Sequence, residues 1–251
     1  MDKPKRGVAT LVYRGIVAVV MLVIPAVIAG AFLSTALPWI QLLSVIGLFV
    51  WFGHCFVTFP TLALLKRAKL DGLPLNLPNL NYLFADSHAV IRYLITVRME
   101  SFAVGIVGGC FWYVLGGWVF MAPYLVLATA AGAYAPRLAF GWAARGLFAL
   151  IDAVPRLIAR LLLVLAALFT PHTRPIAGLL APNWRTAVAM TLDCSLGGPS
   201  PRGEAAWVGT GTPKATYHQL RRGMMMLVVA AVLLVLLLSA SIVVNLLVKL
   251  I

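Results

Sequence analysis

The sequence predicts an all-α protein, a polytopic transmembrane helical bundle with interfacial or re-entrant helices and two cytoplasmic loop regions. Hydrophobic residues make up 62% of the 251 residues, and charged residues only 11%. A soluble domain carries about 25% charged residues. A chain of this size leaves much of its surface exposed, so the apolar excess cannot all be buried in one core. We therefore expect lipid around the apolar segments and treat residues 1–251 as a single membrane domain.

Long apolar stretches indicate where the helices cross the membrane, because a spanning helix needs about 20 mostly apolar residues. The predicted spans are residues 15–33, 38–65, 101–135 and 224–248. The third stretch fits either one long helix or two short helices hinged at Gly116-Gly117. Its many glycines favour close helix packing in lipid, or a re-entrant pair that lines a site.

The basic residues predict the orientation of the chain. Lysine and arginine number 20, against 7 aspartate and glutamate residues, which gives a net charge of +13. They flank the apolar stretches, and cytoplasmic loops carry such an excess. We therefore place the N-terminus and the loops 66–100 and 171–223 in the cytoplasm. On a soluble domain this charge would suggest nucleic acid, but aromatic residues do not alternate with basic ones on a polar domain, so no nucleic-acid partner is expected.

Two segments carry charges within apolar sequence. Asp86-Ser87-His88 is typical of a helix N-cap, and the following helix carries Arg92 and Arg98 among apolar positions, which predicts an interfacial helix. Residues 146–170 are expected to form a partly interfacial helix. There Asp152, Arg156 and Arg160 recur every four residues, so Asp–Arg pairs can form on one face. This face indicates either a polar cavity or arginines that extend toward the headgroups.

Sequence motifs of soluble enzymes are absent. The chain contains no GxxxxGK[ST], HExxH or GxSxG pattern. Its four histidines lack the spacing of metal ligands, and Cys55, Cys110 and Cys194 show no CxxC pairing. The sequence therefore predicts no metal site from spacing.

One string in the second polar region has a recognisable order. It runs Pro182-Asn183, Ala189-Met190, Leu196-Gly197-Gly198-Pro199, Gly203-Glu204 and Trp207-Val208-Gly209. This resembles the C-terminal region of the CobD/CbiB family of cobalamin-biosynthesis membrane proteins. Upstream, Glu100 and Gly105 resemble parts of the family's ENTxDG motif, and Pro155 falls in register with the family's NYLPAR stretch. The resemblance covers about residues 80–248.

The resemblance implies a location and a chemistry. Family members are bacterial inner (plasma) membrane enzymes that join adenosylcobyric acid to an aminopropanol phosphate, forming an amide. It implies catalytic roles for Glu100, Asn183 and Glu204. The associated candidates for substrate binding are Arg98, Tyr134, Asp152, Arg156 and Arg185. ATP and Mg²⁺ would be needed only if this activity is retained, and no cofactor is otherwise expected.

Most acidic positions of the family pattern are replaced in this chain. Val104 stands where the family's ENTxDG motif has Asp, and Ser101 and Phe102 replace its Asn and Thr. Four further acidic positions of the pattern fall on Phe148, Ala149, Ala187 and Thr210. The run Leu150 to Arg156 is more similar to AmpE-like membrane proteins, which also lack the acidic blocks. Two hypotheses follow: a non-catalytic or diverged member with a scaffold, sensing or assembly role, or an active amide-forming ligase. The expected partners are the lipid bilayer and a membrane protein or a second copy of the chain. A transporter is disfavoured because no buried charge series or paired broken helices are predicted.

Overall fold

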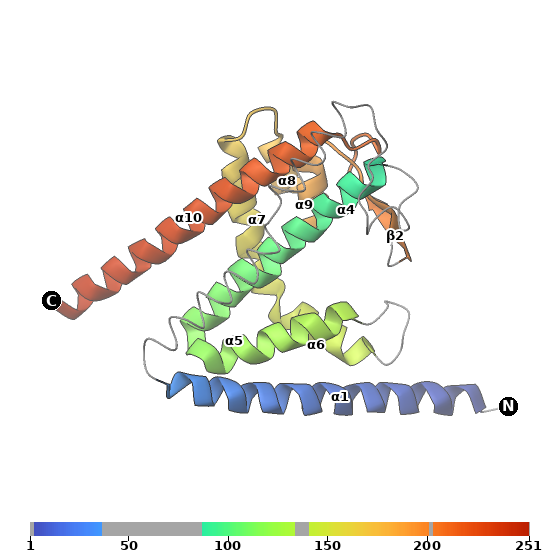
Figure 1. Ribbon diagram of the computed structural model, residues 1–251, viewed down its shortest axis with the longest axis vertical. Coiled ribbons are helices and arrows are strands. Elements are labelled where there is room, and N and C mark those ends of the chain that lie inside the picture. The colour runs from blue at the N-terminus through green and yellow to red at the C-terminus, as the bar shows by residue number, and fades with distance from the viewer. Residues whose placement is uncertain (1–2, 37–86, 134–140, 201–202, 251) are drawn as a thin grey trace. The chain divides into compact units, whose positions relative to one another are not determined.

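The computed structural model describes residues 3–36, 87–133, 141–200 and 203–250, and it is mostly helical (Figure 1). This confirms the helical fold class. The chain forms two compact units. Unit 1 comprises Met1–His54 and Ala103–Arg156, and unit 2 comprises Cys55–Phe102 and Leu157–Ile251.

Unit 1 is built from α1 (Lys3–Ser34), α5 (Gly109–Ala133) and α6 (Trp142–Ile151). Helix α1 packs along α5, and both contact α6. The approach of α1 to α5 is close at Gly30, where a Cβ atom would lie 2.3 Å from the carbonyl oxygen of Trp118. Small residues permit such contacts between apolar helices. Val19, Leu127 and Ala144 form a buried cluster in this unit.

A backbone break divides α5 at the predicted glycine pair. Gly116 and Gly117 have non-helical dihedral angles, and Gly117 has φ 60° and ψ −146°. Only glycine adopts that combination readily, because any other side chain would be strained there. Of the two alternatives for residues 101–135, the structure therefore shows two helical pieces with a sharp turn between them (Figure 1).

Helix α4 (Ser87–Glu100) begins at the predicted N-cap motif. It runs directly into a π-helical segment, η1 (Ser101–Gly108), and then into α5. The boundary that the sequence analysis placed at residue 100, between an interfacial helix and a span, is therefore not an end of the helix. The physical reason is that residues 96–104 contain no proline or glycine, so nothing in this stretch interrupts the backbone hydrogen bonds.

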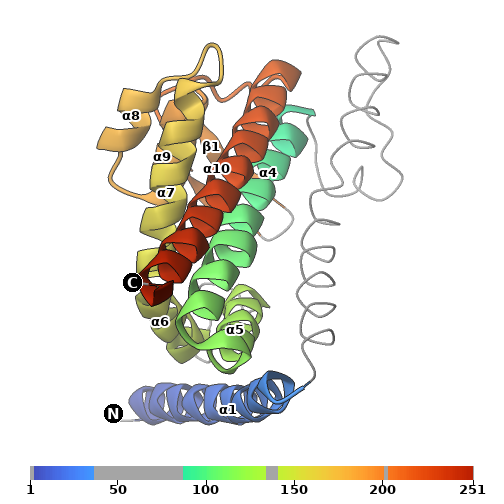
Figure 2. The ribbon, with the colours of Figure 1, turned by 90° about the vertical axis from the view of Figure 1, so that its left-hand side faces the viewer.

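Unit 2 contains α4, most of the helix α7 (Ala153–Leu168) and a folded polar region. The first four residues of α7 belong to unit 1. The other elements of unit 2 are α8 (Pro175–Leu180), α9 (Trp184–Thr191), β1 (Leu196–Ser200), β2 (Gly203–Val208) and α10 (Tyr217–Leu250). The two strands pair antiparallel, with Leu196 opposite Val208 and a bulge between Leu196 and Gly198. Helix α9 packs on both strands, and α4 packs on β1 and α10 (Figure 2). The hairpin was not anticipated within the loop 171–223.

Two predicted boundaries are shifted. Residues 146–170 are not one helix: α6 starts at Trp142, and a turn at Asp152 separates it from α7. Helix α10 starts at Tyr217 rather than at residue 224. The Gln219 side chain accepts a hydrogen bond from the Thr216 N–H at 2.8 Å and caps its first turn. That turn is polar and two arginines, Arg221 and Arg222, follow it, so the apolar pattern alone places the start too late.

Among the described residues, three helical segments are long and apolar enough to cross a membrane: Val12–Ser34, His88–Gly132 and Tyr217–Ala240. They support a membrane protein. The predicted span 38–65 and residues 66–86 of the first loop lie outside the described residues.

Candidate functional site

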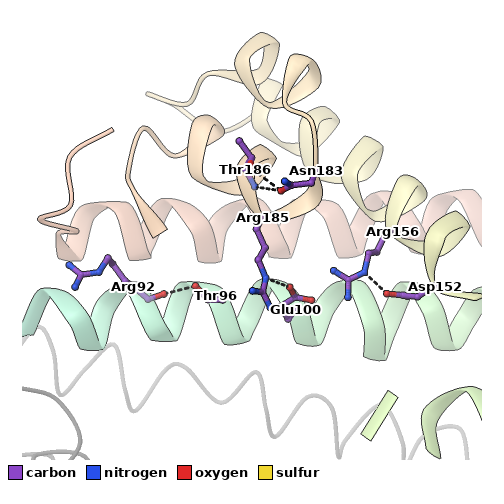
Figure 3. A network of polar contacts seen from close by, with 8 residues as sticks. All are labelled: Arg92, Thr96, Glu100, Asp152, Arg156, Asn183, Arg185 and Thr186. Atoms are coloured by element: carbon purple, nitrogen blue, oxygen red, sulfur yellow. Dashed lines mark hydrogen bonds and ion pairs between the residues drawn. The ribbon is translucent and has the colours of Figure 1, made fainter. Parts of the chain in front are cut away.

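Glu100 and Arg185 meet in unit 2, although 85 positions separate them in the sequence. Glu100 ends α4, and Arg185 lies in the first turn of α9. The Arg185 Nε atom donates a hydrogen bond to Glu100 Oε1 at 2.9 Å (Figure 3). The Arg185 side chain is 59% exposed and that of Glu100 is 21% exposed. Water therefore screens the pair, and we expect it to stabilise the fold by less than about 1 kcal/mol.

Asn183 is the N-cap of α9. Its side-chain oxygen accepts hydrogen bonds from the backbone N–H and the hydroxyl of Thr186, each at 2.9 Å (Figure 3). This contact satisfies one of the N–H groups that have no partner within the helix itself. The asparagine that was predicted to be catalytic thus has a structural role as a helix cap. It also orients the first turn, which holds Arg185 toward Glu100.

A buried arginine that the sequence analysis did not select lies on the same helix as Glu100. Arg92 is only 7% exposed. Its Nη1 atom donates a hydrogen bond to the Pro213 carbonyl, and its guanidinium lies 4.9 Å from the ring centroid of Trp207. One turn earlier, His88 Nδ1 lies 2.8 Å from the Ala215 carbonyl oxygen. The two side chains hold α4 against residues 213–215. Their spacing of four residues is the sequence signal that could have revealed this polar stripe.

The segment between α9 and β1 is held by Asp193. Arg174 Nη1 lies 3.1 Å from Asp193 Oδ1, and Gln219 Nε2 donates to the Asp193 carbonyl at 3.1 Å. The neighbouring Cys194 is fully buried. Burial raises the pKa of the Cys194 thiol to about 12, and Asp193 adds to this rise while Arg92 opposes it. Because the thiolate is the reactive form, Cys194 remains an inert thiol near neutral pH.

The Asp152–Arg156 ion pair that the sequence predicted lies in unit 1, with a buried carboxylate and an arginine side chain that is 32% exposed. Arg156 Nε donates to Asp152 Oδ2, as the four-residue spacing predicted (Figure 3). Tyr124 donates a hydrogen bond to the other carboxylate oxygen, Oδ1, at 2.7 Å. Asp152 is fully buried, and Tyr124 is nearly so. Both oxygens of the carboxylate therefore have partners, as a buried charge requires. Sequence spacing could find Arg156 but not Tyr124, which is 28 residues away.

The other candidates are placed as follows. Arg98 lies in the last turn of α4 and is partly exposed. The backbone of Glu204 pairs with Pro199 in the hairpin, while its side chain lies outside the described part of the structure. Tyr134 also lies outside the described residues. Glu100, Asn183 and Arg185 are thus brought together in unit 2, and Asp152 and Arg156 in unit 1.

The donor sets among the described side chains do not fit a magnesium site. Mg²⁺ requires carboxylate or water oxygens in octahedral geometry. In the part of the chain that the structure describes, no three His, Cys, Asp or Glu side chains come together. The carboxylates of Glu100, Asp152 and Asp193 each contact an arginine. This arrangement suits cohesion of the fold more than it suits metal-assisted chemistry.

Comparisons with known proteins leave the chain without an assigned family: no family model, curated protein or solved structure matches it.

Proposed function

We propose that this chain is a bacterial plasma-membrane protein related to the CobD/CbiB family, and that it is a non-catalytic or diverged member with a scaffold, sensing or assembly role. One observation carries the proposal: two polar residues retained from the family pattern, Asn183 and Glu100, have structural partners. Asn183 caps α9, and Glu100 forms an ion pair with Arg185. Each contact is explained by the chain itself, without a substrate.

The retained glycines of the pattern support the same conclusion. A Cβ atom at Gly197 would lie 2.3 Å from the Ala206 carbonyl oxygen, and one at Gly198 would lie 2.5 Å from the Trp207 ring. Both residues have positive φ angles. These positions are restricted by the hairpin and its close contacts. The family features described here thus shape the polar region, whereas most acidic positions of the pattern are replaced by Val, Phe, Ala and Thr.

The proposal places the N-terminus and the polar region of unit 2 in the cytoplasm of a multi-pass protein. Lys3, Lys5 and Arg6 precede the apolar part of α1. Lys214, Arg221 and Arg222 precede the apolar part of α10. Positive charge at these ends is typical of cytoplasmic loops. Two fusions to the N-terminus test this orientation: a reporter that fluoresces only in the cytoplasm, and a phosphatase that is active only in the periplasm. Fluorescence of the first fusion supports the orientation, and activity of the second contradicts it.

The decisive experiment is complementation of a strain that lacks the step joining aminopropanol phosphate to adenosylcobyric acid. An active family enzyme, expressed at the same membrane level, is the positive control. We expect the present chain not to restore growth, because its candidate carboxylates are engaged by arginines.

Rescue of growth would contradict the proposal and establish the alternative, an amide-forming enzyme that uses ATP and Mg²⁺. In that case Glu100→Gln should abolish rescue, while Asp193→Asn, which alters another arginine-paired carboxylate, should not. The same membranes can be crosslinked in vivo to test for assembly. A defined complex with a second copy or with another membrane protein supports the proposed role, and a strictly monomeric chain contradicts it.

A further inference from the structure

Helix α7 has two apolar faces, of which only one is covered by the protein. Ala159, Leu163 and Ala166 are fully buried. The opposite face exposes large apolar side chains at helical spacing: Leu157, Leu161, Leu165, Leu168 and, just past the helix end, Phe169. Phe169 is 70% exposed. A row of this kind on a protein surface indicates contact with an apolar phase or partner. Helix α7 is not among the three segments long enough to cross a membrane within the described residues.

Helix α8 extends this apolar surface. Its side chains Ile176, Leu179 and Leu180 are exposed, Leu180 by 76%. The guanidinium of Arg160, on α7, donates a hydrogen bond to the Leu179 carbonyl at the end of α8. The last carbonyls of a helix have no partner within the helix, and in hydrocarbon no water can supply one. Arg160 therefore satisfies a carbonyl that would be costly to place in an apolar phase.

A contact between the α7–α8 connection and α10 defines the polar boundary of this surface. Arg222 donates a hydrogen bond to the His172 carbonyl at 3.3 Å. Both apolar segments have one end close to this contact. The apolar part of α10 begins at Met224, two positions after Arg222, and the exposed row of α7 ends at Phe169, three positions before His172. Figures 1 and 2 both show α7 and α10 extending from this end toward the same side of unit 2. The exposed row on α7 therefore ends at the level where the exposed apolar residues of α10 begin; these include Val228, Val232 and Val235.

Basic side chains gather at that same level. Arg221 is exposed and Arg222 is partly exposed, beside the exposed His172 ring and the exposed Arg174, which pairs with Asp193. Phosphate groups of anionic lipids attract such residues at the membrane surface. A protein partner that covered the exposed row of α7 would not require basic residues at the end of that row. A bilayer accounts for both features, because its hydrocarbon matches the apolar row and its anionic headgroups match the basic residues beyond it. Both the continuity with α10 and the charge thus favour lipid as the occupant.

We propose that the outer face of α7, together with α8, is immersed in the acyl-chain region of the bilayer as a further membrane-inserted element, and that His172, Arg174, Arg221 and Arg222 lie among anionic headgroups. Arg160 is the positioning residue that holds α8 at this depth. The inference rests on the proposed membrane location but not on the absence of catalysis.

The test uses single cysteines labelled with a small fluorophore in the full chain, with Cys55, Cys110 and Cys194 replaced, reconstituted in vesicles of phosphatidylcholine and phosphatidylglycerol. Labels at Leu161 and Leu180 report on the surface. Val235 on α10 is the control for lipid contact, and Thr210, in the exposed polar region, is the control for water. We expect lipids brominated on the acyl chain to quench the fluorescence of the labels at positions 161 and 180 as strongly as that of the label at position 235. Iodide dissolved in the water phase should quench only the fluorescence of the label at position 210.

Quenching of Leu161 and Leu180 by iodide would show that water covers the surface, and protection from both quenchers would show that protein covers it. Either result overturns the inference. Because the replaced cysteines could impair folding, the second arm introduces p-benzoylphenylalanine at Leu180 in the natural chain. Photocrosslinks to phospholipid support the proposal, and crosslinks to protein alone contradict it. Complementation is scored separately, so failure of this test is distinguishable from failure of the proposed function.

Discussion

Two carboxylate–guanidinium pairs of this protein differ mainly in their surroundings. In unit 1, Asp152 is fully buried between Arg156 and Tyr124. In unit 2, Glu100 and Arg185 form a similar pair that water reaches. The Coulomb energy of an ion pair rises as the dielectric constant falls, and so does the cost of leaving one member alone. The buried pair should therefore be essential to its unit, while the exposed pair should orient a helix and contribute little stability.

The largest effect is expected for Asp152→Ala, which leaves Arg156 and the Tyr124 hydroxyl without their shared acceptor. Removing one member of a buried pair costs about 3–5 kcal/mol. The free energy of unfolding, measured by denaturant titration in detergent, should fall by that amount. Tyr124→Phe is the matched control because it keeps the ion pair and removes only a hydroxyl, which contacts Asp152 Oδ1 and, at 3.3 Å, the Val104 carbonyl oxygen. This variant should cost less. A loss below about 1 kcal/mol for Asp152→Ala would show that the pair is not buried as described.

Gly30→Leu tests the apolar packing of unit 1 by steric means. A Cβ atom at this position would lie 2.3 Å from the backbone oxygen of Trp118. Overpacking of this kind costs about 1–3 kcal/mol, because α1 must move away from α5. Thermal unfolding in detergent should show the loss. Gly146→Leu provides the control, since nothing lies within 4 Å of an added Cβ atom there, and equal losses for the two variants would contradict the close approach.

Asn183→Ala removes the cap of α9 in unit 2, at an expected cost of about 1 kcal/mol. Asn183→Asp and Asn183→Ser keep an acceptor for the Thr186 N–H and should retain most of the stability. The three variants can be compared by their thermal midpoints in one detergent. If the aspartate and serine variants lose as much as the alanine variant, the side chain does more than cap the helix, and the enzymatic hypothesis gains support.

The smallest effect is expected for Arg185→Gln and Glu100→Gln. Each substitution should lower the free energy of unfolding by about 1 kcal/mol or less. The double exchange Glu100→Arg with Arg185→Glu should recover part of any loss, because it restores opposite charges. A double-mutant cycle gives the coupling energy directly. Salt should weaken this coupling more than it weakens that of Asp152 with Arg156, since only exposed pairs are well screened. Equal salt sensitivity would remove the contrast between the two pairs.

Local patterns of the sequence predicted much of the fold. The apolar stretches predicted the helical segments around residues 15–33 and 224–248, and the glycine pair at Gly116-Gly117 located the break in α5 as one of two alternatives. Each of these depends on residues close together in the chain. The boundaries were less accurate, because the polar first turn of α10 lies outside the apolar pattern, and because nothing between Glu100 and Gly105 ends the helix that begins at Ser87.

The candidate site was predicted less completely, for a physical reason. The Asp152–Arg156 pair follows from helical spacing. The contacts of Tyr124 with Asp152 and of Arg92 with Pro213 join residues far apart, and no local pattern records them. The hairpin was missed because its strands are short and rich in glycine, although Gly198-Pro199-Ser200 and Gly203 are typical of residues near a tight turn. Whether the site acts on a substrate is a question for the complementation experiment.

The hairpin of unit 2 also has a consequence for how the protein behaves in a crowded membrane. A ribbon of two strands presents two open edges, and open edges recruit strands from other molecules. Here both strands are short, a bulge disturbs β1, and Pro199 has no N–H group to offer to a neighbour. The ribbon is thus protected against edge-to-edge aggregation, so copies gathered in a membrane or extracted into detergent should not associate through these strands.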